Sequence, residues 1–465
     1  MKITVQSSKV IKPAYGSRGA PRCPDDTDVV VPLTVFDKVN FDEHILAVSF
    51  FHPPSPPASA LELGFAEALA AHRAWAGRLG GDRSTILLND AGARLVEATA
   101  DVALASLAPL EHPTPELRLA LNPDLAGGEE EEEVMVVQVT RFACGSFAVG
   151  TAAHHLVSDG RGASAFLVAW GNATRGAAMD LAVPAPLRAS VFPPRCPPRV
   201  EFEHRGAEFI TTPLAAGEPR GLLLLHGVCR SSSHEDDDDE SVVIRRVRFG
   251  REFIAKLKSA ASSSSSPPYS TVQCVAAHIW RCATRARGIA GGEAVTTLRV
   301  AVDGRARMRG RRPGVPDGYT GNVVLWARAT AAAGELVSKP VGHAAGLVSR
   351  AVSRVDDRYF RSFIDFASSG AVEAEGLTPA ADPARKVHSP DMEVYSLVGI
   401  SFNDLDFGTG RPFLRRLSHL PEGHVVIESS PSGDGGVDAL VCLFSRAMNA
   451  FEACCYNLAM GDARL

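Results

Sequence analysis

The chain has 465 residues, of which 45% are hydrophobic, and its formal net charge is -5 at pH 7. A chain of this length is too long to fold around a single hydrophobic core, so we expect two domains with a seam between them. The nearly balanced charge argues against nucleic acid or an anionic membrane as the main partner. The sequence shows neither a signal peptide nor a membrane span, and nine scattered cysteines without a C-x-x-C pair are typical of reduced thiols. A cytoplasmic monomer without a metal site is therefore expected.

Helix and strand patterns alternate in the first half of the chain. Apolar residues on one helical face predict a helix over residues 60–79, and Ser59 and Glu62 stand at the spacing of a capping box. Two strands joined by an Asn-Asp-Ala-Gly turn are predicted over residues 84–98, and two more over residues 134–155. The first half is therefore expected to form a mixed α/β layer.

The last of these strands ends in HHLVSDG, residues 154–160, and GRGASAFLVAW after it predicts the start of a helix. His155 would then lie where a strand meets a turn, and a neutral imidazole there can take a proton from a hydroxyl or an amine. Asp159 could accept a hydrogen bond from the ring, or instead pair with an arginine and fix the turn. Taken alone, His-x-x-x-Asp also fits a histidine without a catalytic role at a domain surface.

A proline-rich stretch over residues 183–225 has little periodicity and predicts a crossing segment between domains. We therefore expect one domain over residues 1–182 and a second over residues 226–465. Three low-complexity runs are expected to be surface loops or disordered insertions: residues 129–133, 231–240 and 261–268.

The second half repeats the alternation of strands and helices. Strands are predicted over residues 242–249, 296–307, 322–329 and 394–402, a pair of strands over residues 425–444, and helices over residues 269–287 and 445–459. Each half would then hold a mixed β-sheet with covering helices, which is an α/β fold class. An enzyme with this organisation is expected to have its site at the junction of the two domains.

Other catalytic signatures are missing from the sequence. It has no G-x-S-x-G, no H-E-x-x-H, no P-loop and no strand-coupled G-x-G-x-x-G, which argues against several hydrolase, nucleotidase and dinucleotide-dependent classes. DFGTG at residues 406–410 is similar to the kinase Asp-Phe-Gly, but the companion kinase motifs are absent, so a sharp structural turn is the favoured interpretation. The remaining chemistry is base catalysis with neither a metal nor a redox cofactor.

Four segments together resemble a known family. HHLVSDG, YSTVQCVAAHIWR, VDGRARMRGRRPGVPDGYTGN and NDLDFGTGRP stand in the order, and roughly at the spacing, seen in the plant BAHD acyltransferases. The resemblance implies two chloramphenicol-acetyltransferase-like domains with an active-site channel at their interface. It also implies acyl-coenzyme A as a co-substrate, with no bound cofactor.

The same resemblance assigns roles to particular residues. His155 would be the general base and Asp159 the residue that supports the loop, with Arg305 as its candidate salt-bridge partner. The second motif is chiefly structural in the family and is formed here by Asp406, Phe407, Gly408 and Gly410. Thr409 replaces the tryptophan that is usual in this motif, which is expected to cost packing but to leave the base unchanged.

Within the family, the chain resembles the grass enzymes that transfer hydroxycinnamoyl or related aromatic acyl groups to amines, on PLTVFDKVNFDEHILAVSFFHPP and EVYSLVGISFNDLDFG. Leu397 stands where shikimate- and quinate-using relatives carry a tryptophan, which disfavours those acids as acceptors. Tyr395 and Ser396 are candidate channel residues and oxyanion donors, and Glu393 and Asp404 are candidate carboxylates for a cationic amine. Each of the four also fits an ordinary structural or surface role.

Coenzyme A carries phosphates, so Arg251, Lys256 and Lys258 are candidate binding residues, with solvated surface charges as the alternative interpretation. The predicted reaction transfers an aromatic acyl group to an amine such as agmatine, putrescine, tryptamine or tyramine, in plant specialised metabolism. Three alternatives stay open. An O-acyltransferase would share every motif, a silent binding protein would need a broken base, and a peptide-synthetase condensation domain would act on a carrier protein.

Overall fold

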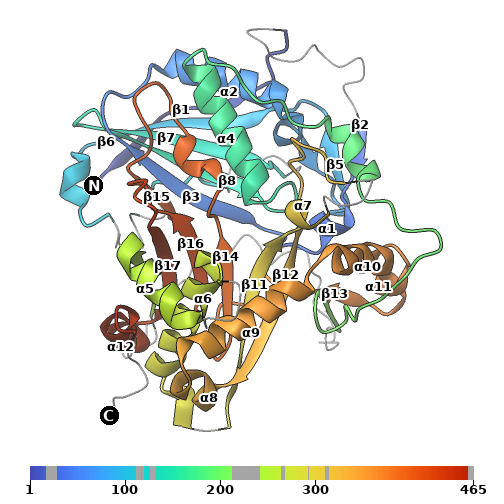
Figure 1. Ribbon diagram of the computed structural model, residues 1–465. Helices are drawn as coiled ribbons and strands as arrows, with labels where there is room; N and C mark the ends of the chain where they lie inside the picture. Colours follow the sequence, from blue (N-terminus) through green and yellow to red (C-terminus); the bar gives the residue numbers. More distant parts are fainter. Residues whose placement is uncertain are drawn as a thin grey trace, which may run out of the picture.

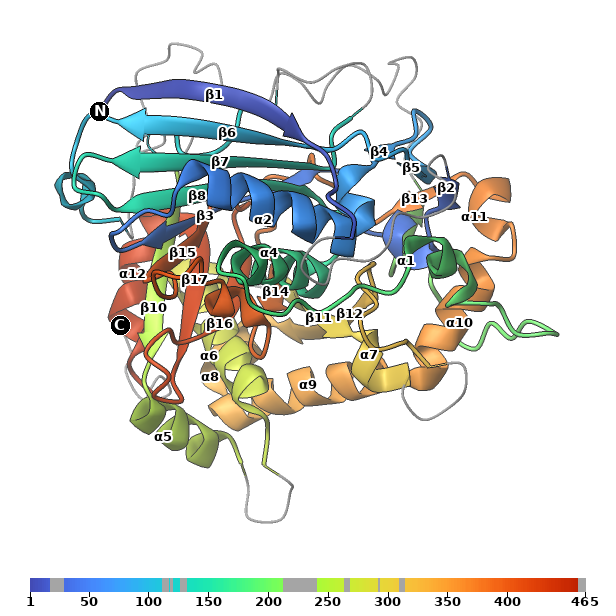
Figure 2. The same cartoon turned by 90° about the horizontal axis from the view of Figure 1, so that it is seen from above.

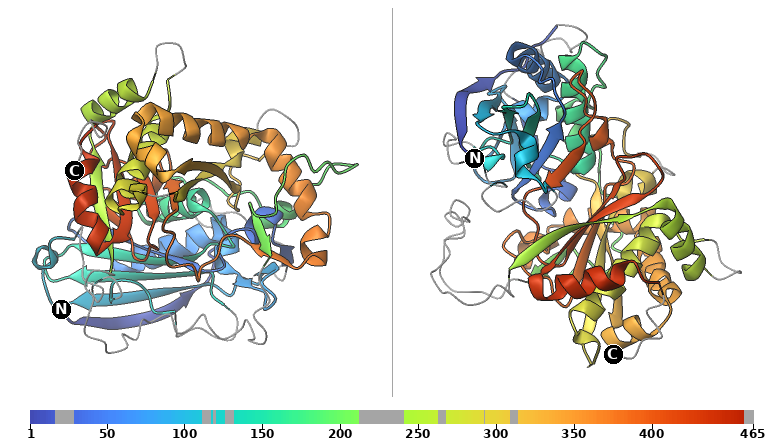
Figure 3. Two further views of the ribbon diagram at one scale, coloured as in Figure 1. Left: turned by 90° about the horizontal axis from the view of Figure 1, so that it is seen from below. Right: turned by 90° about the vertical axis from the view of Figure 1, so that its left-hand side faces the viewer.

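The computed structural model describes residues 1–16, 29–110, 117, 120–125, 132–211, 241–262, 268–291, 293–308 and 314–458. Within these residues, two six-stranded sheets organise the molecule. Figure 1 shows the first sheet above the second, and the side view in Figure 3 shows that each sheet belongs to its own body.

The first sheet has the strand order β1-β6-β7-β8-β3-β15. These strands are β1 (Ile3–Ile11), β6 (Ala93–Ala100), β7 (Met135–Phe142), β8 (Phe147–His154), β3 (His44–Phe51) and β15 (Leu414–Leu417). All neighbours are antiparallel except β6 and β7, which run parallel. Helices α2 (Ala58–Ala71) and α4 (Gly160–Thr174) pack on each other beside this sheet (Figure 2). Phe65, Phe166 and Trp170 from these helices are fully buried in the first core, where their rings are in contact.

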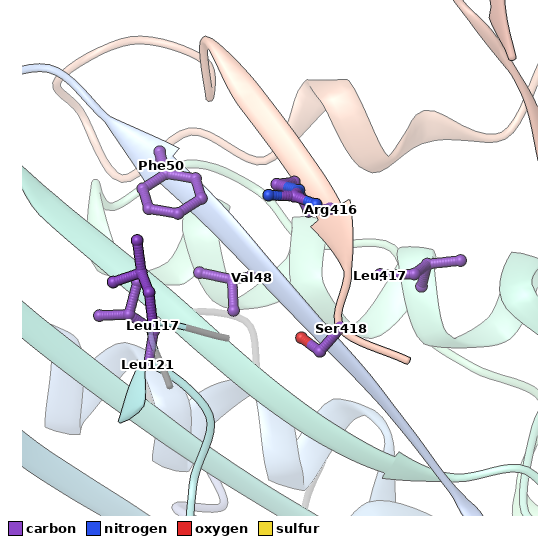
Figure 4. Close-up of a pocket in the computed structure, with 7 residues that line it drawn as sticks. All are labelled: Val48, Phe50, Leu117, Leu121, Arg416, Leu417 and Ser418. Carbon is purple, nitrogen blue, oxygen red and sulfur yellow. The ribbon is translucent and has the colours of Figure 1, made fainter. Parts of the chain in front are cut away.

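The edge strand β15 comes from the second half of the sequence. It pairs antiparallel with β3, from Leu414 opposite Phe50 to Leu417 opposite Ala47. A pocket of about 20 Å³ remains beside this pairing (Figure 4). Its lining residues are Val48, Phe50, Leu117, Leu121, Arg416, Leu417 and Ser418. That volume is enough for roughly one water molecule, so the pocket is too small for an acyl group.

The second sheet has the order β10-β17-β16-β14-β11-β12. These strands are β10 (Val242–Phe249), β17 (Val437–Phe444), β16 (His424–Ser429), β14 (Met392–Ser396), β11 (Val295–Asp303) and β12 (Val324–Ala332). Its helices are α5 (Arg251–Ala261), α6 (Thr271–Ala286), α9 (Val341–Arg354), α10 (Asp357–Ala367) and α12 (Ser445–Cys455). Helix α6 begins with a capping box between Ser270 and Gln273 and buries Trp280 in the second core.

Shorter elements complete the described chain. The short strands are β2 (Val29–Pro32), β4 (Arg78–Leu79), β5 (Thr85–Leu88), β9 (Phe209–Thr211) and β13 (Leu377–Pro379), and the short helices are α1 (Val35–Lys38), α7 (Gly304–Arg307), α8 (Ala333–Ser338) and α11 (Ala371–Ala374). None of the helices among the described residues has the length and apolar character needed to cross a bilayer.

The helix predicted over residues 60–79 is shorter than expected. It ends at Ala71, and a 3-10 turn over Arg73–Ala76 and strand β4 follow it. The residues beyond Ala71 stay apolar because Trp75 and Leu79 are buried in the first core, so the hydrophobic pattern continues where the helix does not. The predicted capping box is also wrong, since the N-cap is a proline without a side-chain cap.

One further predicted strand is shorter than expected, and the low-complexity runs lie largely outside the described residues. The strand predicted over residues 394–402 ends at Ser396, and Ser401–Asp404 form a 3-10 turn. The run at residues 231–240 and most of the runs at residues 129–133 and 261–268 lie outside the described residues.

Candidate active site

The turn that carries His155 begins where β8 ends. The amide of His155 donates to the carbonyl of Glu43 at 2.9 Å, which continues the pairing of β8 with β3 by one residue. Helix α4 then begins at Gly160, and the carboxylate of Asp159 caps it by accepting from the amides of Arg161 and Gly162, both at 3.2 Å. A strand end and a capped helix start therefore fix both ends of the turn.

Buried polar groups hold the backbone of this turn from the outside. The side chain of Asn322 donates to the carbonyl of His155 at 2.8 Å, and Arg188 donates to the carbonyl of Val157 at 2.7 Å. Both donors meet the fully buried carboxylate of Asp37, which lies 3.0 Å from the Asn322 side chain and 3.2 Å from Arg188. The turn is thus fixed by residues from three distant parts of the sequence.

Asp159 pairs with Arg305 and supports the loop through this ion pair. The guanidinium donates to the two carboxylate oxygens at 2.7 and 3.2 Å, and the amide of Val323 donates to the same carboxylate at 3.2 Å. Burial alone would raise the pKa of Asp159, but the charge and hydrogen bonds of Arg305 hold it below its usual value. Of the two roles that the spacing left open, the structure shows the arginine pair.

The imidazole of His155 lies at the seam between the two sheets. Its ring contacts Phe41 edge-on, with centroids 5.9 Å apart, and Phe41 contacts Trp326 of β12 in the second sheet at 6.3 Å. The side chain keeps some solvent exposure, and Nδ1 has no partner among the described residues. Burial lowers the pKa of His155, against the opposing effect of Asp159, so the ring is neutral at pH 7 and able to accept a proton.

Glu393 and Tyr395 belong to a buried network of the second sheet. Tyr395 donates to Glu393 at 2.8 Å, and Arg299 lies 3.3 Å from the other carboxylate oxygen. His388 and His424 complete a group whose possible ligand atoms lie within 4.8 Å of Glu393 and of each other. Arg299 already neutralises the charge that a metal ion or an acceptor ammonium would need from Glu393. The Tyr395 hydroxyl is likewise engaged, so this structure does not present it as a free oxyanion donor.

The structure places the three other acceptor candidates differently. Leu397 lies beside the start of α4, since a Cβ on Gly160 would come within 3.3 Å of its side chain. The Ser396 hydroxyl accepts from the amide of Val398 at 3.4 Å. Asp404 is about half exposed and pairs with Arg411 at 2.9 Å on the surface. Leu397 is therefore close to the histidine turn, whereas Asp404 has the character of a surface acid.

The DFGTG motif forms a tight turn that packs against α4. The carboxylate of Asp406 accepts from the amides of Gly408 at 2.8 Å and Gly410 at 3.0 Å, and both glycines have φ near +100°, at +95° and +101°. Phe407 is buried against Trp170 of α4, with ring centroids 4.8 Å apart. Thr409 takes no part in this ring packing. The motif thus supports the helix that Asp159 caps.

The candidate coenzyme A residues lie on α5. Arg251 and Lys256 are exposed and Lys258 is partly exposed, on a helix that packs on α6 and α9. Figure 2 shows α5 at the side of the second body that is remote from the first sheet. No contact among the described residues joins these three side chains to the histidine turn, and their role stays a prediction.

Sequence reasoning missed the residues that hold the turn from outside. Asp37, Arg188 and Asn322 are polar residues with 0–2% exposure, and each lies in a different segment. One signal was available, because Asp37 and Asn322 lie within the segments PLTVFDKVNF and DGYTGN that carry the family resemblance. Nothing in the proline-rich segment distinguished Arg188 from its neighbours.

Comparison with known proteins gives consistent matches along the whole chain. A family model described as the Transferase family matches residues 1–458. The chain is 55% identical over 463 residues to Agmatine coumaroyltransferase-1 of Hordeum vulgare, covering 98% of this chain and 100% of that protein. It is 44% identical over 463 residues to Putrescine hydroxycinnamoyltransferase 3 of Oryza sativa subsp. japonica, with the same coverage. The crystal structure of F. graminearum TRI101 complexed with Coenzyme A and T-2 mycotoxin has a TM-score of 0.69 at 17% identity, covering 91% of this chain and 97% of that chain.

Two mixed sheets with covering helices, and a histidine turn held at their seam, define a two-domain α/β acyltransferase. The chain belongs to the Transferase family, and the BAHD resemblance of its motifs is confirmed.

Proposed function

We propose that this enzyme transfers a hydroxycinnamoyl group from coenzyme A to the primary amine of an aliphatic amine such as agmatine, forming an amide. One observation carries the proposal: the 55% identity to an agmatine coumaroyltransferase extends over 98% of a chain whose His155 is held at the domain seam. The lower identity to a putrescine enzyme, at 44%, favours agmatine among these amines.

His155 acts as the general base in the proposed reaction. The amine nitrogen attacks the thioester carbonyl while His155 removes a proton from it, and a tetrahedral oxyanion forms. Collapse of this intermediate breaks the carbon–sulfur bond, and the imidazolium returns the proton to the departing thiolate. The products are the amide and free coenzyme A, so no covalent acyl-enzyme is needed. Asp159 and Asn322 act as positioning residues because they hold the turn rather than touch the reacting atoms.

An amine acceptor imposes a pH dependence on this reaction. An alkylammonium has a pKa near 10. At any pH below that value, the neutral, nucleophilic fraction of the amine increases about tenfold for each unit by which the pH is raised. Burial lowers the pKa of His155 below its usual value near 6.5, so the neutral ring predominates at pH 7 and adds little to a rise above that pH. We expect kcat/KM for the amine to rise between pH 7 and pH 9. A flat profile, with the chemical step shown to limit the rate, would contradict the proposal.

A panel of acceptors tests the proposal directly. Free thiol release from p-coumaroyl-CoA is measured with agmatine, putrescine, tryptamine, tyramine, shikimate and an aliphatic alcohol. We expect release with the amines, highest with agmatine, and mass spectrometry should identify the amide. Release with only the alcohol or shikimate would keep the fold and the base but replace the proposed acceptor class.

The finer features of the enzyme are part of the same proposal. We propose a channel at the seam where acyl-coenzyme A and the amine meet, a domain division near residues 183–225, and a cytoplasmic monomer that needs no metal. The proline-rich composition of residues 183–225 supports the domain division, and the position of His155 supports the channel. The cytoplasmic location, the monomeric state and the independence from metal stay predictions. Binding of coenzyme A phosphates by Arg251, Lys256 and Lys258 stays a prediction.

A further inference from the structure

The backbone of Glu43 is paired with that of His155, one residue beyond the paired ends of β3 and β8. In the register of β3 and β8, His44 faces His154, and the hydrogen bond from the His155 amide to the Glu43 carbonyl sets the next pair. Opposed residues of antiparallel strands present their side chains on the same face, about 5 Å apart at Cβ. Phe41, two residues before Glu43, belongs to this face and contacts the His155 ring.

The neighbouring acid Asp42 points to the other face. Its carboxylate lies 3.5 Å from His154 and 3.1 Å from Arg83. Asp42 and Glu43 precede β3, which begins at His44, so the contacts of Asp42 place its carboxylate on the side of His154. Glu43 is therefore the acid of this segment that shares a face with the base, and Asp42 is its matched control.

The carboxylate of Glu43 has no charged partner in contact with it. Among the described residues, no hydrogen bond or ion pair involves this side chain, although the residue is largely shielded from solvent. Burial raises the pKa of Glu43 to about 7, with Lys386 opposing the shift and Asp382 and Asp42 adding to it. Lys386 itself is exposed and donates to the carbonyl of Pro383. A partly buried carboxylate of this kind is stabilised in its ionised form by a cation that comes into contact with it.

We propose that Glu43 binds the second, non-reacting cationic group of the acceptor, a guanidinium or an ammonium at the far end of a short aliphatic chain. This inference rests on the proposed function and deepens it by naming the substrate class: aliphatic amines with a distal positive charge. With the nucleophilic amine at His155, a flexible methylene chain can bring the distal group to the opposed carboxylate. Glu393 is less suited to this role because Arg299 already neutralises it, and Asp404 is paired on the surface.

Three acceptors with the same four-carbon chain distinguish binding of the distal cation by Glu43 from a general effect of Glu43 on activity. Agmatine carries a distal guanidinium, putrescine carries a distal ammonium, and n-butylamine carries no distal charge. We expect Glu43→Gln to lower the ratio of kcat/KM for agmatine to kcat/KM for n-butylamine by on the order of 10- to 100-fold, mainly through KM, because a charge-assisted hydrogen bond is lost. The ratio for putrescine should fall as well, and Glu43→Asp should recover part of both losses.

Two control variants make the result specific. Asp42→Asn removes an adjacent carboxylate that points to the other face, so it should leave the agmatine to n-butylamine ratio within about twofold. Lys386→Met removes the exposed competing cation, so the ratio should stay the same or rise. If Lys386 were instead the structural partner of Glu43, both Lys386→Met and Glu43→Gln would impair all three acceptors to a similar degree, and this would overturn the inference.

The outcomes distinguish the inference from the function on which it rests. Agmatine turnover by the unmodified enzyme with an unchanged ratio in Glu43→Gln would overturn the role of Glu43 and leave the amine acyltransferase proposal intact. No turnover of any amine by the unmodified enzyme would overturn both. If Glu43→Gln does not fold, Glu43→Asp decides, because its shorter carboxylate should lower the ratio and an unchanged ratio would contradict the proposal.

Discussion

Replacing His155 by alanine is expected to lower kcat for amine acylation by about 10²- to 10⁴-fold, because the reaction loses the general base that we propose. The ring makes few contacts that stabilise the fold, because Nδ1 has no partner among the described residues. The side chain of Asn322 binds the backbone carbonyl of His155 and not its ring. The melting temperature should therefore change little. The measurement is single-turnover acylation of agmatine from p-coumaroyl-CoA, with product quantified by mass spectrometry.

The adjacent histidine is the control for this prediction. His154 is 1% exposed and its ring lies on the other face of the sheet, near Arg83 and Asp42. His154→Gln is expected to cost stability while the folded fraction keeps its acylation rate within a few fold. Full activity in His155→Ala together with loss of activity in His154→Gln would show that the wrong histidine has been assigned as the base.

Asp159→Asn is expected to lower the free energy of unfolding by up to about 3–5 kcal/mol, because it removes the buried counter-charge of Arg305 and leaves only the more exposed Asp303, at 3.4 Å. The side chains of this pair are 6% and 12% exposed. The pKa of Asp159 is held below its usual value, so the stabilisation is complete at neutral pH and is lost as the pH falls through that lowered pKa. Urea denaturation at pH 7 measures the effect, and kcat should fall too because the turn loosens.

A surface ion pair provides the matched comparison. Asp404 and Arg411 lie at a similar separation, 2.9 Å, but their side chains are 48% and 70% exposed. Asp404→Asn should change the free energy of unfolding by less than about 0.5 kcal/mol. Equal losses in the two variants would show that burial does not set the strength of the Asp159 pair.

The fold was predictable from sequence where local signals coincide with burial. The start of α4 was predicted from the Asp-Gly turn, and a helix over residues 269–287 was predicted where α6 lies, and both helices are present. The helix ending at Ala71 was predicted too long, since the buried residues after it continue the apolar pattern in a different backbone conformation. Helices α9 and α10 were not predicted, although both are amphipathic and bury one face.

The site was predictable in its residue types but not in its contacts. The His-x-x-x-Asp motif and Arg305 could be proposed because the family pattern names them, and the structure brings Arg305 to Asp159. The residues that hold the turn come from segments near residues 37, 188 and 322, and only tertiary packing brings them together. The position of Glu43 opposite His155 likewise depends on strand register, which a single sequence does not reveal.

The pairing of β15 with β3 has a consequence for how this protein is made. Strand β3 leaves the ribosome early, whereas its partner is synthesised about 360 residues later. Until then one edge of β3, the neighbour of the strand that precedes the histidine turn, has unpaired backbone groups, and such edges recruit other strands. Nascent chains and C-terminal truncations that end before residue 414 should therefore depend on chaperones, and a fragment carrying the complete His155 motif should aggregate instead of forming a smaller working enzyme.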